Sequence, residues 1–203
     1  FVQGLVCIAC YPIAIVIVFT VRGFFQALSG YLLGDSTAQE EGFLSLNPMV
    51  HMDPTGLIVL LLCLITVEFF SPGEFFSPYI FGILIFLAGQ WRYQVPITLS
   101  MFRHPRIATF LLVVAEAVGL YLCAVIALLL LMFFPVTQIG QFAHVFTLLC
   151  YLTAQCALWF GIISCLPLPP SRSFIMLMQN APASWDQFLD CRSMLFLYVF
   201  SYS

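Results

Sequence analysis

The sequence predicts an all-α integral membrane protein, a polytopic helical bundle of about four to six membrane segments. Two observations predict this class. Of the 203 residues, 63% are hydrophobic and 7% are charged, whereas about 25% of the residues in a soluble domain are charged. The apolar residues also fall in runs, several of which reach the about 20 residues that a helix needs to cross the hydrocarbon core. A single membrane domain over residues 1–203 suits the length of the chain.

The predicted segments follow the apolar runs in order. The first run predicts a span over residues 4–29, and the polar, glycine-containing residues 30–46 are expected to form a loop. Two shorter runs, 56–70 and 75–90, are separated by a Ser-Pro-Gly-Glu break. They predict either two short tilted helices or a hairpin that does not fully cross. The stretch 92–106 carries three arginines and two prolines, so an exposed connection is expected there.

The second half of the chain predicts two full spans, over residues 107–134 and 142–166. The last apolar run, 194–202, is too short to cross a membrane. Arginine-rich loops favour the cytoplasmic side, so 92–106 and 167–192 are both placed there, as two intervening spans allow. The side of the N-terminus stays open, because it depends on how often the two shorter runs cross.

Composition excludes several classes of function. Six arginines, no lysine and a net charge of −3 give no basic surface for nucleic acid. Most of the eight cysteines lie inside apolar runs, where they are expected to pack as small hydrophobes rather than form disulfides. The pair Cys7 and Cys10 has metal-ligand spacing but lies within the first run, which favours packing. No basic n-region or small-residue cleavage site begins the chain, so no cleaved signal peptide is expected.

Two motifs stand out against this apolar background. VRGFFQA, at residues 21–27, puts Arg22 and Gln26 one helical turn apart inside the first predicted span. NPMVHMDPTG, at residues 47–56, is dense in polar and turn-forming residues. Ionisable side chains are costly within a bilayer and usually mark a functional or paired site.

The order of motifs resembles the site-2 protease family of intramembrane zinc metalloproteases. Bacterial members carry H-E-x-x-H-A on a membrane helix, then L-G-D-x-T-A, L-N-P-x-x-H-x-D-P-x-G and N-L-x-P-x-P-P-L-D-G. The corresponding stretches here are VRGFFQA at 21–27, LGDSTA at 33–38, LNPMVHMDPTG at 46–56 and SCLPLPPSRS at 164–173. The resemblance covers about residues 14–173, and its third block is unbroken. It implies a site-2-protease-like membrane core.

The departures from the family pattern fall on its chemistry. In the family, the two histidines of H-E-x-x-H and the aspartate of L-D-G hold zinc, and the glutamate is the general base. The matching positions here are Arg22, Gly23, Gln26 and Arg172. Arginine stays protonated and has no free lone pair for a metal. The resemblance therefore implies the fold, while these residues predict no catalytic residue, no metal and no cofactor.

The retained block is expected to be structural. Its turn-forming residues suit short-range hydrogen bonds between side chains and backbone. A remnant metal site built on His51 and Asp53 is the alternative, but two ligands are too few for tight zinc binding. A site that adds a cysteine to these two is the least favoured interpretation. The retained residues are Asn47, Pro48, His51, Asp53, Pro54 and Gly56.

The arginines that replace the ligands need acceptors. We expect Arg22 or Arg172 to form an ion pair with Glu116 or Asp53, linking helices in place of zinc. Glu116 lies where family members have a small A-G-P-type packing motif. The alternative is that each arginine extends to the interface and binds water or lipid phosphate.

These observations predict a pseudoprotease that is a structural or regulatory subunit of a larger membrane complex. Its expected partners are other membrane subunits and lipids, and no nucleic acid. The expected location is a bacterial inner membrane or an organellar membrane derived from it. Two alternatives stay open: an active protease with a rebuilt zinc site, and a small transport or lipid-binding module. The 22 phenylalanines suit contact with either lipid or a partner.

Overall fold

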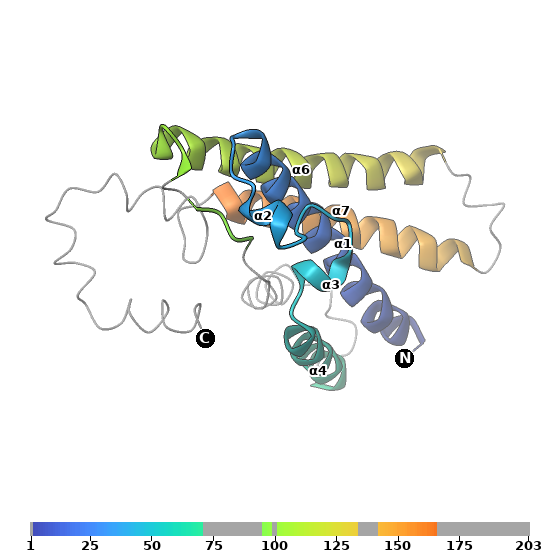
Figure 1. The fold of residues 1–203 in the computed structure, drawn as a ribbon. Coiled ribbons are helices and arrows are strands. Elements are labelled where there is room, and N and C mark those ends of the chain that lie inside the picture. Colours follow the sequence, from blue (N-terminus) through green and yellow to red (C-terminus); the bar gives the residue numbers. More distant parts are fainter. Residues whose placement is uncertain (1, 71–94, 99–100, 134–141, 166–203) are drawn as a thin grey trace, which may run out of the picture.

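The computed structural model describes residues 2–70, 95–98, 101–133 and 142–165, and every regular element in this part of the chain is a helix (Figure 1). Four of the helices are long and two are single turns between α1 and α4. Their bounds are Val2–Leu32 for α1, Thr37–Glu40 for α2, Pro48–His51 for α3, Pro54–Phe70 for α4, Pro105–Phe133 for α6 and Phe142–Cys165 for α7.

The architecture is a small bundle around α1. Helices α6 and α7 pack side by side along their length, and α1 crosses and packs against both (Figure 1). The short helices α2 and α3 lie against α1, and α4 also contacts it. The main core lies where α1, α4, α6 and α7 meet, with Tyr11, Ile15, Leu64, Leu120 and Phe160 among its most buried side chains.

Three helices in the described part are long and apolar enough to cross a membrane: Ile8–Leu32, Arg106–Phe133 and Phe142–Cys165. A shorter apolar helix covers Pro54–Thr66. The prediction of an all-α membrane protein is confirmed. The expected segments 75–90 and 194–202, and Arg172, lie outside the described residues.

Most predicted segments have a helix at the same place, with shifted ends. The first continues to Leu32 and the fourth begins at Pro105, where proline is tolerated because the first helical N–H needs no intrahelical partner. The prediction of a loop over 30–46 is wrong at its start, because α1 continues to Leu32. The short helix α2 also lies within this range. The last described helix, α7, begins where the sequence predicts and ends at Cys165.

A glycine cap fixes the end of α1. Gly34 has a φ of +99°, in the left-handed region that favours glycine. Its N–H donates to the Tyr31 carbonyl at 3.0 Å, and the Asp35 N–H donates to the Gly30 carbonyl at 3.0 Å. This pair of bonds is a Schellman motif, which satisfies the last carbonyls of a helix. The LGD tripeptide at 33–35 thus ends α1 and turns the chain toward α2.

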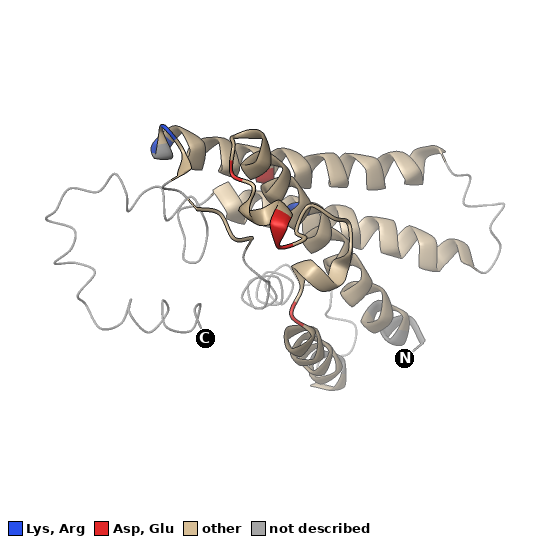
Figure 2. Cartoon of the chain, viewed as in Figure 1, with Lys and Arg blue, Asp and Glu red and all other residues tan. Residues whose placement is uncertain are grey.

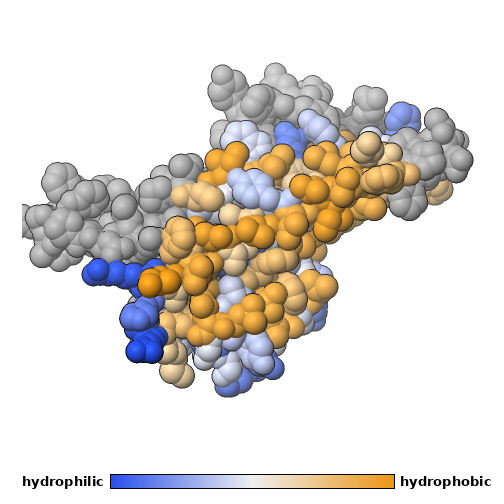
Figure 3. All heavy atoms as spheres, turned by 90° about the horizontal axis from the view of Figure 1, so that it is seen from above, coloured by the Kyte–Doolittle hydropathy of each residue, from blue (hydrophilic) through white to orange (hydrophobic). Residues whose placement is uncertain are grey.

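On the side shown in Figure 3 the outer surface is apolar over a broad face, and the hydrophilic residues lie around its edges, with the most strongly hydrophilic group at one end. Charged residues are few, and arginines cluster where α6 begins (Figure 2). Such a surface suits contact with lipid. Exposed apolar side chains on α6 include Ile107, Phe110, Val114, Val118, Leu122, Val125 and Ile126.

Candidate functional site

The VRGFFQA segment lies in the middle of the bundle. Arg22 and Gln26 are 5% and 2% exposed, so neither side chain reaches the surface of the protein. They are one turn apart on α1, and residues spaced by four point from the same helix face. That face is turned toward α6 and α7. The polar pair is therefore held inside the fold rather than extended to the interface.

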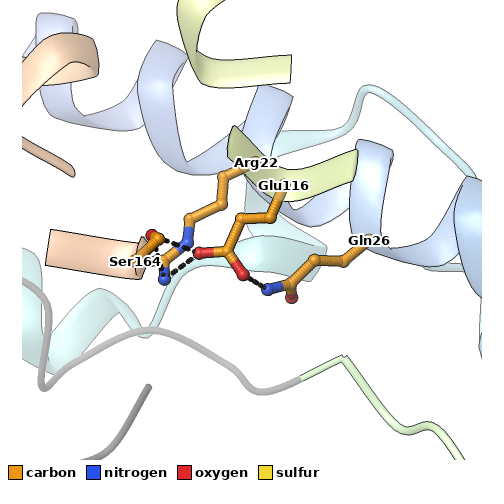
Figure 4. A network of polar contacts seen from close by, with 4 residues as sticks. All are labelled: Arg22, Gln26, Glu116 and Ser164. Carbon is orange, nitrogen blue, oxygen red and sulfur yellow. Dashed lines mark hydrogen bonds and ion pairs between the residues drawn. The ribbon is translucent and has the colours of Figure 1, made fainter. Parts of the chain in front are cut away.

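Four side chains from three helices form one polar network (Figure 4). The Arg22 guanidinium on α1 forms an ion pair with the Glu116 carboxylate on α6. The Nη2 group of Arg22 also donates to Ser164 Oγ on α7 at 2.9 Å, and Ser164 Oγ donates to Glu116 Oε1 at 2.5 Å. Gln26 Nε2 donates to the other carboxylate oxygen, Glu116 Oε2. The network links α1, α6 and α7 inside the bundle, with all four residues buried.

The charges in the network are matched. Arg22, Gln26 and Ser164 all direct donors at Glu116, which suits an ionised carboxylate, since that group only accepts. The Arg22 charge also lies over the Phe160 ring, with Cζ 5.9 Å from the centroid, at cation–π range. Arg22 Nε is buried and has no hydrogen-bond partner within the described part of the chain. The contacts of the guanidinium to Glu116 and Ser164 are made through Nη2.

Gly23 gives room for a histidine from the retained block. His51, on α3, is 2% exposed, and its ring lies directly against the Gly23 backbone. A Cβ added at Gly23 would lie 2.9 Å from both Cγ and Cε1 of His51, and closer still to Nδ1. Gly23, at the position that the resemblance matches to the glutamate of H-E-x-x-H, is thus the residue that lets His51 approach α1.

The NPMVHMDPTG block builds the short helix and the turn that carry His51. Asn47 caps α3 by accepting from the Met49 N–H at 3.1 Å. Asp53 accepts from the N–H and hydroxyl of Thr55, both at 2.9 Å, at the start of α4. Pro48 and Pro54 begin α3 and α4, and Gly56 is buried.

The sequence left open which carboxylate forms an ion pair with an arginine. In the structure, Arg22 forms an ion pair with Glu116. Asp53 instead lies at a helix start, where its carboxylate binds Thr55. Arg172 is not among the described residues. The extension of Arg22 to the interface is not what is observed, because its side chain is 6% exposed.

Sequence reasoning missed two members of the site. Ser164 bridges the ion pair from the end of α7, and its position at the head of SCLPLPPSRS was the available signal. Gly119 lies one turn after Glu116, and a Cβ there would come within 2.6 Å of Phe25 Cδ2. This close approach of α1 and α6 puts the carboxylate within reach of Arg22, and a small residue near Glu116 was its only sequence signal.

The residues at this site do not fit a zinc ion. A protonated guanidinium repels a cation and cannot coordinate it, and an amide is a poor zinc ligand compared with imidazole, thiolate or carboxylate. Within the described ranges, no three His, Cys, Asp or Glu side chains gather closely enough to hold a metal. The carboxylate at the centre, Glu116, already accepts from three side chains.

Comparison with known proteins finds a distant relative. The chain is 26% identical over 174 residues to a protein of Bacillus subtilis (strain 168) named "Putative zinc metalloprotease YwhC", covering 84% of this chain and 68% of the relative. No family model matches the chain. No solved structure matches it either. The match agrees with the resemblance of the motifs and supports a site-2-protease-like relationship.

Proposed function

We propose that this chain is a catalytically inactive, site-2-protease-like membrane protein that acts as a structural or regulatory subunit of a larger membrane complex. The observation that carries the proposal is the ion pair between Arg22 and Glu116. It puts a permanently protonated group where the resemblance expects the first zinc-binding histidine.

The chemistry around the pair supports inactivity. Hydrolysis by this family's mechanism needs a metal to activate water and a base to take its proton. Gly23 has no side chain to act as that base, and the ring of His51 fills the space beside it. Gln26 donates its amide to Glu116, so this side chain is already engaged with the carboxylate.

The same network supports a structural role. In the family that this chain resembles, zinc joins the H-E-x-x-H helix to the aspartate of L-D-G, which follows a later span. Here Glu116 joins α1 to α6, and Ser164 joins both to α7. A buried pair with satisfied partners fixes how helices meet, even where its net contribution to stability is small. The polar network thereby holds the helices together in place of a metal. The exposed apolar faces remain for contact with lipids and with other subunits. The membrane is a bacterial inner membrane or an organellar membrane derived from it.

Metal content and cleavage test the inactivity. The purified protein is assayed for bound zinc by mass spectrometry and for cleavage of a reporter that carries a single transmembrane helix. We expect zinc well below one equivalent and no cleavage above that of the reporter incubated without this protein. Stoichiometric zinc together with chelator-sensitive cleavage would overturn the proposal.

The second candidate is an active metalloprotease with a rebuilt zinc site. The similarity to a protein named as a zinc metalloprotease favours it. It predicts that cleavage depends on ligands other than positions 22 and 26. His51→Ala is the discriminating variant, since a rebuilt site would draw on the buried imidazole, and zinc binding would fall with it.

The subunit role is tested in native membranes. The tagged chain is solubilised gently, separated on a native gel and quantified with its co-migrating proteins. We expect one set of membrane proteins at a fixed ratio to this chain in independent preparations. Migration as an isolated chain at every detergent concentration tested would contradict the role in a complex.

A further inference from the structure

We propose that the turn before α6 and the first turns of that helix form a binding site for an anionic phospholipid. Arg103 and Arg106 hold the phosphate of the headgroup, and the acyl chains lie along the apolar face that begins at Ile107. The site goes beyond the proposed function, because an inactive subunit and an active protease would bind such a lipid in the same way.

The two arginines are open to an external anion. Arg103 and Arg106 are exposed, as is His104 between them, where α6 begins (Figure 2). Within the described ranges, neither arginine forms an ion pair or a side-chain hydrogen bond. Arg22, the third arginine in these ranges, is instead buried and paired with Glu116. The positive charge at the start of α6 is therefore not neutralised by the described part of the chain.

The turn that carries Arg103 is fixed by its neighbour. Phe102 is 7% exposed and packs in a cluster with Ala108 and Leu112 of α6, which Leu33 at the end of α1 also contacts. The start of the helix is closed by a bond from the Ala108 N–H to the carbonyl of residue 104, at 3.0 Å. An anion can thus bind here without first ordering the backbone, which lowers the cost of binding.

The arginines lie at the depth of a headgroup. The apolar span on α6 runs over Arg106–Phe133, so Arg106 is its first residue and Arg103 lies just outside it. Arginine at the end of a span places its charge in the headgroup region. Exposed apolar side chains follow at once, at the spacing of one helix face. They are Ile107, Phe110, Leu111 and Val114, with exposed fractions of 58%, 52%, 41% and 39%.

This arrangement favours an anionic phospholipid over other anions. A guanidinium binds phosphate oxygens through paired hydrogen bonds, and two of them favour a headgroup with net negative charge. Free phosphate has no apolar part to cover the face below the arginines. An acidic segment of a partner protein would use the charge but not the apolar residues at chain depth. Residues 92–106 are also predicted to face the cytoplasm, where anionic lipids give the leaflet its negative potential.

Competition between two lipids tests the site. The full chain in detergent is given equal amounts of phosphatidylglycerol and phosphatidylcholine, and bound lipids are counted by native mass spectrometry. We expect phosphatidylglycerol to be preferred. Arg103→Gln and Arg106→Gln should each weaken its binding about fivefold, the factor that one arginine contributes near an anionic membrane surface. The double variant should lose most of the preference.

Gln39→Glu is the matched control, since Gln39 is exposed on α2 and the change lowers the net charge by the same single unit. It should leave the preference unchanged, and circular dichroism should show all variants folded. A double variant with the wild-type preference would overturn the inference, as would an equal loss in Gln39→Glu.

Two further measurements separate the other sources of negative charge. Release of the lipid by an excess of inorganic phosphate would show a site for free anions and would contradict lipid binding. On a native gel, the double variant should keep its co-migrating proteins. If it loses a protein and still prefers phosphatidylglycerol, the arginines bind an acidic partner and the proposed lipid site is wrong.

Discussion

The guanidinium of Arg22 and the carboxylate of Glu116 form an ion pair between α1 and α6, with both side chains almost fully buried. Removing one partner of a buried pair strands the other charge and costs about 3–5 kcal/mol. We therefore expect Glu116→Gln and Arg22→Met each to destabilise the protein strongly. The double variant should lose less than the sum of the two, because no charge is then left unpaired.

Unfolding in mixed micelles, followed by circular dichroism over a denaturant titration, measures this coupling. Glu40→Gln is the control, since Glu40 is exposed and its carboxylate accepts from the neighbouring Ser36 hydroxyl within the same short turn. Its effect should stay within about 0.5 kcal/mol, as for most surface substitutions. If the double variant loses as much stability as the two single variants together, the pair does not act as a unit.

Ser164 gives a graded test of the same network. Its hydroxyl accepts from Arg22 at 2.9 Å and donates to Glu116 at 2.5 Å. Loss of a buried partner costs about 1–3 kcal/mol, so Ser164→Ala should destabilise less than Glu116→Gln. The matched control is Thr153→Ala on α7, whose hydroxyl bonds within its own helix, to the Leu149 carbonyl. Equal effects of the two hydroxyl deletions would refute a bridging role for Ser164.

The fold class could be predicted because apolar run length follows directly from the thickness of a membrane. Helix ends could not, because they depend on local caps. The Schellman turn at Gly34 and the start of α6 at Pro105 decide where α1 ends and α6 begins. Hydropathy alone carries neither signal, although a glycine after an apolar run and a proline before one were both present.

The site was predictable only as a set of alternatives. A buried arginine needs an acceptor, and an apolar chain offers few, so Glu116 was among the candidates. Choosing between Glu116 and Asp53 required knowing how α1 crosses α6. This crossing depends on packing between side chains that are far apart in the sequence. Ser164, Gly119 and the contact of His51 with Gly23 were missed for the same reason, because each acquires its role only from a neighbouring helix or loop.

The crossing of α1 and α6 depends on Gly119. A Cβ at this position would come within 2.6 Å of Phe25 Cδ2 and 2.8 Å of Phe25 Cβ. Overpacking of this kind costs about 1–3 kcal/mol, so Gly119→Ala should lower the free energy of unfolding by that amount. Removing the ring with Phe25→Ala should make Gly119→Ala less harmful, because it deletes Cγ, which would lie 2.5 Å from the added Cβ. Denaturant titration of the four proteins measures the coupling, and a Gly119→Ala effect that Phe25→Ala leaves unchanged would count against the close approach.

Asp35 ties the end of α1 to a distant segment of the chain. Its carboxylate accepts from the N–H and hydroxyl of Thr37, at 3.0 and 2.5 Å, and from the Thr98 N–H at 2.7 Å. Asp53 makes the same two bonds to Thr55, but it is more exposed. The two aspartates are therefore matched in their local turn and differ in the bond to Thr98 and in burial.

This comparison predicts a separation between two alanine variants. Asp53→Ala should cost about 0.5–2 kcal/mol, as loss of a helix cap does. Asp35→Ala should cost more, because hydrogen bonds to a charged group are worth about 1.5–3 kcal/mol each. Hydrogen exchange read at residues 95–98 gives the decisive measurement. Exchange there should rise in Asp35→Ala and not in Asp53→Ala, and equal exchange in the two variants would mean that the Thr98 bond does not hold this segment against α1.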